Sequence, residues 1–235
     1  SGNPVPFTNF KILILNENFD VVFTSVEYNK SILPGESDTY FKFIYHQENA
    51  FSDEFCDRLI NLFDEKEKED EVSVGSMAGG LDLTIKNTTE INLYDFPELV
   101  NHENFFSVIN KHLSDHFLNN LPFRYYFDGN EKIFPGNTTY ETCQIQKYKK
   151  GEGHYGSWHI EIENLKSAPR VFSMIVYLND VEEGGETGFL YPEMKVKPTK
   201  GALVIFPSAY PFVHCGFKPI SNDKYIVATW LIYTD

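Results

Sequence analysis

A chain of 235 residues with 42% hydrophobic and 16% aromatic residues can bury a substantial core, so large-scale disorder is excluded. Its 20 basic and 34 acidic side chains give a formal charge of −14, which argues against a nucleic-acid partner because the averaged field repels phosphate. No apolar run approaches the roughly 20 residues that span a bilayer, so we expect no membrane partner. Nothing in the sequence indicates the oligomeric state.

The cysteines indicate a reducing compartment. Cys56, Cys143 and Cys215 are an odd set without CxxC spacing, which argues against a disulfide scaffold or a thiolate zinc site. The first residues also lack the basic and apolar regions of a signal peptide, so we expect a cytoplasmic protein. Asn-Thr-Thr triplets at Asn87 and Asn137 match the glycosylation sequon, and secretion therefore stays open as an alternative.

The first half of the chain combines short strands with two helices. Apolar runs at residues 12–15 and 21–23, separated by polar residues, predict a hairpin or two edge strands. Residues 40–45 predict a third strand. Ser52 can cap a helix whose apolar residues recur at helical spacing, namely Phe55, Leu59, Ile60, Leu62 and Phe63. Residues 72–100 are mixed, with glycines that mark loops. A second helix is expected over about 101–119, with one apolar stripe formed by Phe105, Ile109, Leu113 and Phe117.

After Pro122 the pattern is that of short strands separated by Pro, Gly and Asn. Eight runs are apolar or alternating: 141–148, 154–162, 171–178, 188–190, 194–196, 202–206, 212–214 and 225–233. This number and spacing predict a sandwich or jelly roll. We therefore predict an α+β, mainly β fold in one domain over 1–235. Residues 1–121 would supply N-terminal strands and supporting helices, and residues 122–235 the jelly-roll core.

A possible metal site lies in the strand predicted at 154–162. His159 and Glu161 are two residues apart, so both side chains project from one face of a strand. His214, late in the β region, can supply a third ligand. Two imidazoles and one carboxylate leave three positions open on an octahedral metal, which suits non-haem iron(II) and oxygen chemistry. A lone H-x-E is weak evidence, because a solvated histidine and glutamate explain it equally well.

The residue ten positions after His214 strengthens this interpretation. Lys224 places a cation at the start of the last predicted strand, near the proposed metal. A dicarboxylate that chelates the metal through its keto-acid end needs such a cation at its far end. Taken alone, Lys224 would be a surface lysine.

Over residues 140–233 the sequence resembles the prolyl-4-hydroxylase-like branch of the iron(II)/2-oxoglutarate-dependent oxygenases, including virus-encoded forms. A fainter echo lies in the helix that begins Ser52-Asp53-Glu54. The most specific pieces are Gln146-Lys147-Tyr148, Trp158-His159-Ile160-Glu161, Tyr177-Leu178-Asn179-Asp180, Gly184-Gly185-Glu186-Thr187 and Lys197-Pro198-Thr199-Lys200-Gly201-Ala202. The spacing from His214 to Lys224 and the closing Trp230 complete the order.

The resemblance implies a double-stranded β-helix (jelly-roll or cupin-like) core and a dioxygenase that hydroxylates an unactivated C–H bond, with a prolyl residue in a peptide or protein as the implied substrate. Its cofactors would be iron(II), 2-oxoglutarate, O2 and, in addition, ascorbate. The implied metal ligands are His159, Glu161 and His214. The implied cosubstrate residues are Lys224, Tyr148, Thr187 and Trp230. For the last three, a core tyrosine, a turn threonine and a buried strand aromatic are the competing interpretations.

Two departures from the family pattern bear on this assignment. The family usually has aspartate two residues after the first histidine, whereas this chain has Glu161, whose side chain is one methylene longer. Some viral members are expected to have glutamate there too. The gap from Tyr148 to His159 is also longer than in the plant and animal prolyl hydroxylases, so Tyr155 is an alternative to Tyr148 in the wall of the cosubstrate pocket. Two other functions stay open: a non-catalytic jelly-roll protein that binds a metal or ligand, and a small-molecule hydroxylase of the same fold. A viral protein acting in the host cytoplasm is compatible with the resemblance.

Overall fold

The computed structural model describes residues 14–15, 21–23, 43–77, 80–97, 105–119, 125–127, 130–132, 137–191 and 193–234. The chain divides into two compact units, Ser1–Thr39 and Tyr40–Asp235. In the first unit, β1 (Ile14–Leu15) pairs antiparallel with β2 (Val21–Phe23), as the two apolar runs predict. Most of the strand predicted at 40–45 lies outside the described residues. None of the helices in the described ranges is long and apolar enough to cross a bilayer.

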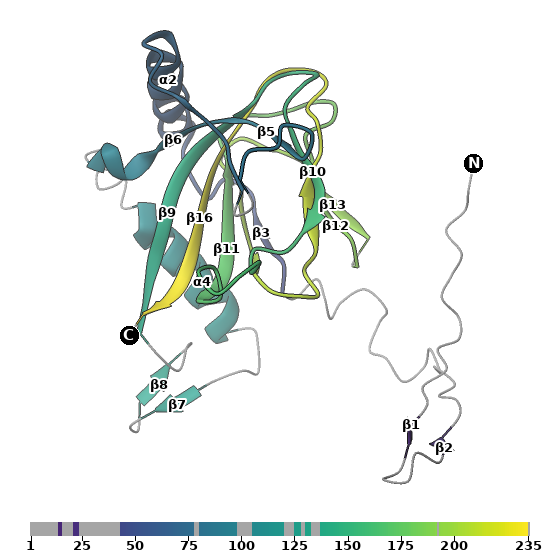
Figure 1. Cartoon of the computed structure of the whole chain (residues 1–235). Coiled ribbons are helices and arrows are strands. Elements are labelled where there is room, and N and C mark those ends of the chain that lie inside the picture. Colours follow the sequence, from purple (N-terminus) through teal and green to yellow (C-terminus); the bar gives the residue numbers. More distant parts are fainter. Residues whose placement is uncertain are drawn as a thin grey trace. The chain divides into compact units, whose positions relative to one another are not determined.

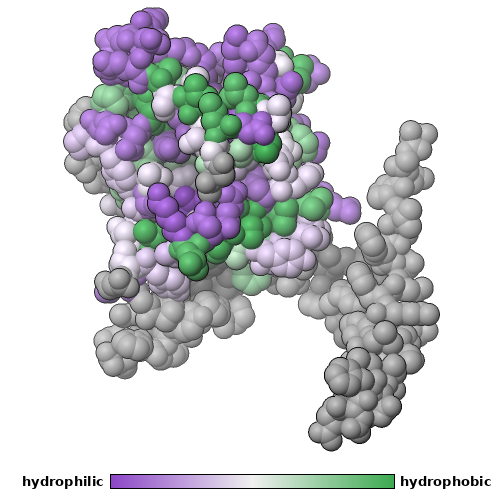
Figure 2. All heavy atoms as spheres, viewed as in Figure 1, coloured by the Kyte–Doolittle hydropathy of each residue, from purple (hydrophilic) through white to green (hydrophobic). Residues whose placement is uncertain are grey.

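Helix α2 (Asp53–Lys68) begins where the sequence predicts. The Ser52 side chain accepts a hydrogen bond from the backbone N–H of Phe55 at 3.2 Å, which satisfies one of the free amides of the first turn. The buried face comprises Phe55, Cys56, Leu59 and Phe63, at the spacing of one helical stripe. The acidic and basic residues of its last turns are solvated and lie in the hydrophilic region at the upper left of the molecule (Figure 2).

Helix α4 (Phe105–Asn119) covers most of the second predicted helix. Phe105, Ile109 and Leu113 are buried, which confirms three members of the predicted stripe, while the Phe117 side chain lies outside the described set. Among the described residues, the 3-10 turn η2 (Leu93–Asp95) precedes it.

The described strands of the second unit form two antiparallel sheets and one separate hairpin (Figure 1). The major sheet has the order β3-β14-β11-β16-β9-β6-β4, and the minor sheet β13-β12-β15-β10-β5. The major-sheet strands are β3 (Tyr45–Gln47), β4 (Ser73–Val74), β6 (Thr89–Asn92), β9 (Asn137–Tyr148), β11 (Arg170–Tyr177), β14 (Leu203–Pro207) and β16 (Lys224–Thr234). The minor-sheet strands are β5 (Lys86–Asn87), β10 (His154–His159), β12 (Thr187–Phe189), β13 (Met194–Val196) and β15 (His214–Gly216). The hairpin pairs β7 (Tyr125–Phe127) with β8 (Asn130–Lys132).

Alternation along the major-sheet strands separates two cores. On β16, Tyr225 and Val227 pack with the two helices, whereas Ile226 and Ala228 face the minor sheet. Successive side chains of a strand point to opposite faces, so one strand serves both cores. The helices therefore support the outer face of the major sheet, and the space between the sheets receives the even-numbered residues of β16. This mainly β architecture with supporting helices confirms the predicted jelly roll.

Two sequence predictions differ from the structure. Residues 72–100 look mixed in sequence, yet they contain β4, β5 and β6, which extend both sheets. These strands are two to four residues long, too short for period-2 alternation to stand out. In the second case, the strand predicted over 154–162 ends at His159, so the prediction that Glu161 lies within it is wrong.

Candidate metal centre and cosubstrate pocket

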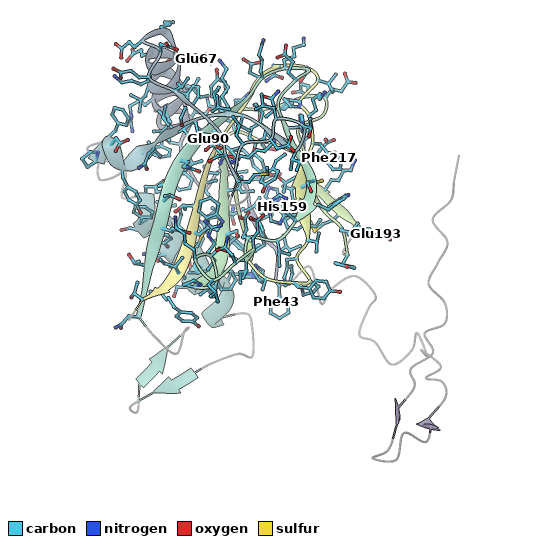
Figure 3. All side chains as sticks on the ribbon, viewed as in Figure 1. Phe43, Glu67, Glu90, His159, Glu193 and Phe217 are labelled. Atoms are coloured by element: carbon cyan, nitrogen blue, oxygen red, sulfur yellow. The ribbon has the colours of Figure 1, made fainter. Side chains whose placement is uncertain are left out.

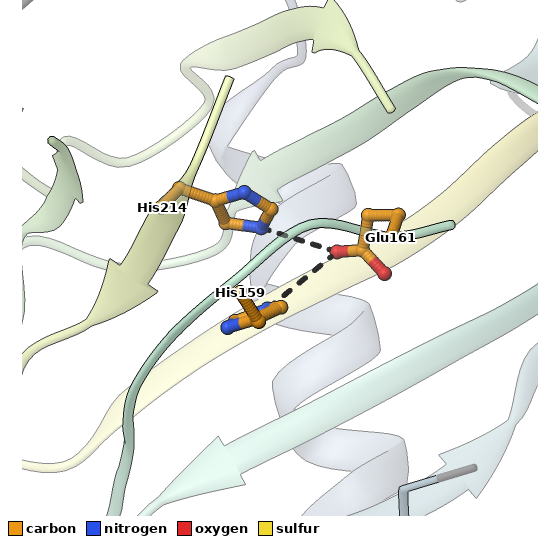
Figure 4. A group of neighbouring side chains, drawn as sticks. All are labelled: His159, Glu161 and His214. Carbon is orange, nitrogen blue, oxygen red and sulfur yellow. Dashed lines mark hydrogen bonds and ion pairs between the residues drawn. The ribbon is translucent and has the colours of Figure 1, made fainter. Parts of the chain in front are cut away.

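His159, Glu161 and His214 converge in the space between the two sheets. One ligand atom from each lies within 4.8 Å of the others, and this is the one such group of three among the described residues. Both imidazoles approach the same carboxylate oxygen: Glu161 Oε1 is 3.1 Å from His214 Nε2 and 3.9 Å from His159 Nε2 (Figure 4). Figure 3 places His159 deep between the sheets, whereas Glu67 lies far out on α2.

Strand pairing brings the two histidines together. His159 is the last residue of β10 and lies directly opposite His214, the first residue of β15. Their ring centroids are 4.4 Å apart. Glu161 lies in the bend after β10, where its backbone N–H donates to the carbonyl of Ser208 at 3.0 Å. A backbone contact, rather than strand alternation, therefore directs Glu161 toward the histidines.

The hydrogen bonds of the imidazoles leave their metal-binding nitrogens exposed to the site. Nδ1 of His159 is 2.8 Å from the carbonyl of Ser157, and Nδ1 of His214 is 3.1 Å from that of Phe212. A carbonyl only accepts, so each Nδ1 carries a proton, and each Nε2 becomes the metal-binding lone pair when its ring is neutral. Nε2 of His214 lies within hydrogen-bond distance of Glu161 Oε1. His159 Nε2 is buried and has no hydrogen-bond partner in the described part of the chain. A cation between the Nε2 atoms and Glu161 Oε1 satisfies all three acceptors, so the residues fit an iron(II) ion.

The electrostatics favour the metal-binding protonation states of His159 and Glu161. Burial, together with the charge of His214, lowers the pKa of His159 to about 4. Burial alone would raise the pKa of Glu161, but the hydrogen bond from His214 and the charges of His214, His159 and Arg170 outweigh it and hold that pKa at about 2. At neutral pH a neutral imidazole and an ionised carboxylate therefore face the site.

A cavity of about 360 Å³ opens from the metal site. The seven residues implied as metal or cosubstrate ligands all line it: Tyr148, His159, Glu161, Thr187, His214, Lys224 and Trp230. Tyr155, the alternative for Tyr148, lines it as well and stacks on His159 with ring centroids 3.8 Å apart. Strand alternation explains part of the set, because Lys224 and Trp230 share the inward face of β16 with Ile226 and Ala228.

Lys224 lies buried on the inner wall of this cavity. Its side chain is 2% exposed and its Nζ donates to the carbonyl of Gly185 at 3.0 Å and lies 4.0 Å from the Tyr148 ring centroid. No described carboxylate forms an ion pair with it, and burial lowers its pKa to about 7. A buried cation without an anionic partner suits the far carboxylate of a dicarboxylic acid.

Tyr177 is a contributor that sequence reasoning missed. Its fully buried hydroxyl donates to Thr187 Oγ1 at 2.6 Å, which leaves the hydroxyl hydrogen of Thr187 available for an acceptor in the cavity. Tyr177 stands on the same face of β11 as Ile175, which lines the cavity, so alternation within 171–178 could have indicated it.

Two charged residues at the cavity also lacked a clear signal. Lys86 reaches it from β5 in a buried ion pair with Glu90 at 2.6 Å. Arg170 is paired with both Glu141 and Glu161. Neither contact follows from local sequence, because Lys86 and Glu90 stand on strands of different sheets, and Arg170 meets Glu141 across the major sheet.

Comparison with known proteins finds similarity to the same family. Residues 143–232 match the 2OG-Fe(II) oxygenase superfamily. Probable prolyl 4-hydroxylase 9 of Arabidopsis thaliana is 28% identical over 116 residues, covering 39% of this chain and 40% of that protein. Prolyl 4-hydroxylase subunit alpha-3 of Mus musculus is 27% identical over 106 residues, covering 39% and 19%. The chain thus matches less than half the length of these relatives.

Solved structures show a shared fold at low identity. A Trichoplax adhaerens prolyl hydroxylase, in complex with a hypoxia inducible factor oxygen degradation domain peptide fragment, has a TM-score of 0.62 at 14% identity, covering 82% of this chain and 84% of that one. The viral collagen prolyl hydroxylase of Paramecium Bursaria Chlorella virus-1 has a TM-score of 0.54 at 20% identity, covering 82% and 97%. That viral members share glutamate at position 161 stays a prediction. Residues 143–232 thus resemble the 2OG-Fe(II) oxygenase superfamily, and the curated relatives that the chain matches are prolyl 4-hydroxylases.

Proposed function

We propose that this protein is an iron(II)- and 2-oxoglutarate-dependent dioxygenase that hydroxylates a prolyl residue in a peptide or protein. The observation that carries the proposal is the convergence of His159, Glu161 and His214 at one cavity that also contains the unpaired cation Lys224. A metal site and an anion site in one cavity are what a chelating dicarboxylate requires.

The chain's own residues would bind and orient the reactants. His159, Glu161 and His214 would hold the iron(II), and Lys224 would bind the far carboxylate of 2-oxoglutarate, with the Thr187 hydroxyl, oriented by Tyr177, beside it. Tyr148 would close the wall, since its ring lies against Lys224 and its hydroxyl donates to Gln146 Oε1 at 3.0 Å. Bound iron supplies the redox chemistry: dioxygen converts 2-oxoglutarate to succinate and carbon dioxide, and a C–H bond is hydroxylated.

Burial of the site serves this chemistry. His214, Thr187 and Lys224 are each less than 5% exposed, so bulk water is kept from the reacting centre. Arg170 stacks on Trp230, with its guanidinium carbon 4.1 Å from the ring centroid. Both residues line the same cavity and would border the peptide. The peptide substrate rests on the relatives, which are prolyl 4-hydroxylases, and on the peptide-bound Trichoplax enzyme.

Domain organisation and compartment are further parts of the proposal. We infer a single catalytic domain over residues 1–235, with supporting N-terminal elements. A reducing, cytoplasmic location is supported by Cys56, Cys143 and Cys215, which are free and buried.

The proposal is tested by incubating the purified full chain with iron(II), ascorbate, 2-oxoglutarate and a proline-rich peptide. Succinate should form with the peptide, which should gain one oxygen atom in mass spectrometry, and Glu161→Ala should abolish both signals. Under argon, iron(II) and 2-oxoglutarate should produce a charge-transfer absorption band. Absence of that band supports a non-catalytic binding protein; a band with succinate formation only on small molecules replaces the peptide with another substrate class.

A further inference from the structure

Glu161 presents its two carboxylate oxygens to different partners. Oε1 faces His214 and His159, as described above. Oε2 is 3.3 Å from Nη1 of Arg170, and the same Nη1 donates to the backbone carbonyl of Glu161 at 3.2 Å. One guanidinium nitrogen therefore holds both the side chain and the main chain of this residue.

Arg170 is itself held on two further sides. Its Nε donates to Oε2 of Glu141 at 2.6 Å, and its guanidinium carbon lies 4.1 Å from the Trp230 ring centroid. The side chain is 19% exposed. Arg170, Trp230 and Glu141 come from β11, β16 and β9, which are adjacent strands of the major sheet. A rigid sheet thus fixes the planar fork, which loses little freedom on forming these bonds.

The contacts of Arg170 restrain the extra rotatable bond that a glutamate ligand has. Compared with aspartate, Glu161 has one more rotatable bond, and it lies beyond the end of β10, where no ladder restrains it. A mobile carboxylate can bind a metal through both oxygens and occupy a position that the cosubstrate or dioxygen needs. An arginine on Oε2 leaves only Oε1 for the metal.

We propose that Arg170 is a positioning residue that makes Glu161 a one-oxygen metal ligand, and that Glu141 and Trp230 hold Arg170 in place. This inference rests on the proposed metal site and goes beyond it, because it assigns the outer contacts that keep three metal positions open. A partner in contact with a ligand is expected to change metal affinity 10- to 100-fold, roughly, when it is lost.

The test measures binding of manganese(II), a redox-silent probe, to the full chain by titration calorimetry, in the variants Arg170→Gln and Arg170→Lys. For Arg170→Gln, a positioning role and an effect of charge alone predict opposite changes in manganese affinity. Removing a nearby cation strengthens binding of a metal cation if charge alone matters. Under the proposal, Arg170→Gln weakens manganese binding about 10- to 100-fold, and Arg170→Lys, which keeps the charge but not the fork, weakens it too.

A second readout follows the open positions. With manganese saturating, Arg170→Gln should also weaken 2-oxoglutarate binding, and the manganese electron paramagnetic resonance spectrum should change in zero-field splitting. Glu141→Gln is the matched variant. It keeps the Arg170–Glu161 contact and should weaken manganese binding less than Arg170→Gln does. Circular dichroism of the metal-free variants verifies folding, and Arg170→Lys serves if Arg170→Gln does not fold.

The outcomes separate this inference from the proposed function. If the unmodified chain binds neither manganese nor 2-oxoglutarate, the metal site itself is refuted. If it binds both, and Arg170→Gln leaves manganese affinity unchanged or tightens it, only the positioning role is refuted.

Discussion

Lys224 shows how one residue gains its function from its surroundings. The same side chain on the surface would be solvated and ordinary, whereas here it is buried beside Tyr148 and the carbonyl of Gly185. Burial disfavours its charged form and lowers its pKa to about 7, against an ordinary 10.5. A bound carboxylate restores the charge, so anion binding and protonation of Lys224 are linked.

This linkage predicts that 2-oxoglutarate affinity depends on pH. The pKa of Lys224 is depressed in the free protein and raised again by the bound anion, so affinity is fully present below pH 7 and falls as pH rises above it. For manganese-loaded protein we expect a dissociation constant about 20-fold higher at pH 8.5 than at pH 6.5, measured by calorimetry. Lys224→Arg, which stays charged, should flatten this dependence; an unchanged pH profile in that variant would assign it to another group.

At the scale of elements, the reliability of a sequence pattern depends on its length. The 16 residues of α2 and the 11 of β16 repeat their pattern often enough to be recognised, and both occur close to their predicted positions. The two residues of β5 are too few to show a repeating pattern, although β5 forms one edge of the minor sheet. Short strands exist because a neighbouring strand supplies their hydrogen bonds, which local sequence does not record.

Helix α2 supplies a stability prediction at this scale. Ser52→Ala removes the acceptor for the Phe55 N–H and should lower the free energy of unfolding by about 1 kcal/mol, measured by urea denaturation. Ser52→Asp keeps an acceptor oxygen and should retain most of the stability. Equal losses in the two variants would show that the cap contributes little.

At the scale of the whole molecule, the site joins the two sheets and the helices stand outside it. His159 and His214 belong to the minor sheet, Lys224 and Arg170 to the major sheet. A metal on His159 and His214, together with a dicarboxylate on Lys224, would link the two layers of the jelly roll, whereas α2 and α4 pack on the outer face of the major sheet.

Joint binding of manganese(II) and 2-oxoglutarate should therefore stabilise the fold. At about 100 times the dissociation constant the gain is about 3 kcal/mol, which raises the melting temperature of a unit of this size by roughly 5–10 °C. Differential scanning fluorimetry measures the shift. His214→Ala should abolish it, and a similar shift in that variant would place the ligands elsewhere.

Local patterns were sufficient for the main architecture and for most of the site. Alternation predicted the strands, the helical stripe predicted α2, and the order of His159, His214 and Lys224 predicted residues that line one cavity. These features repeat along the chain or stand at set spacings, so they can be recognised without a structure. The position of Glu161 was predicted on a wrong premise, because the strand ends two residues earlier.

Contacts between distant segments required the tertiary structure. Ser208 directs the backbone of Glu161, Arg170 holds its outer oxygen, and Tyr177 orients Thr187. Each joins a segment of the major sheet to a segment of the minor sheet, and the packing of the two sheets is set by the whole core rather than by the residues next to each group. The sequence therefore indicated which side chains carry the chemistry, and the arrangement of the sheets determined how they are held.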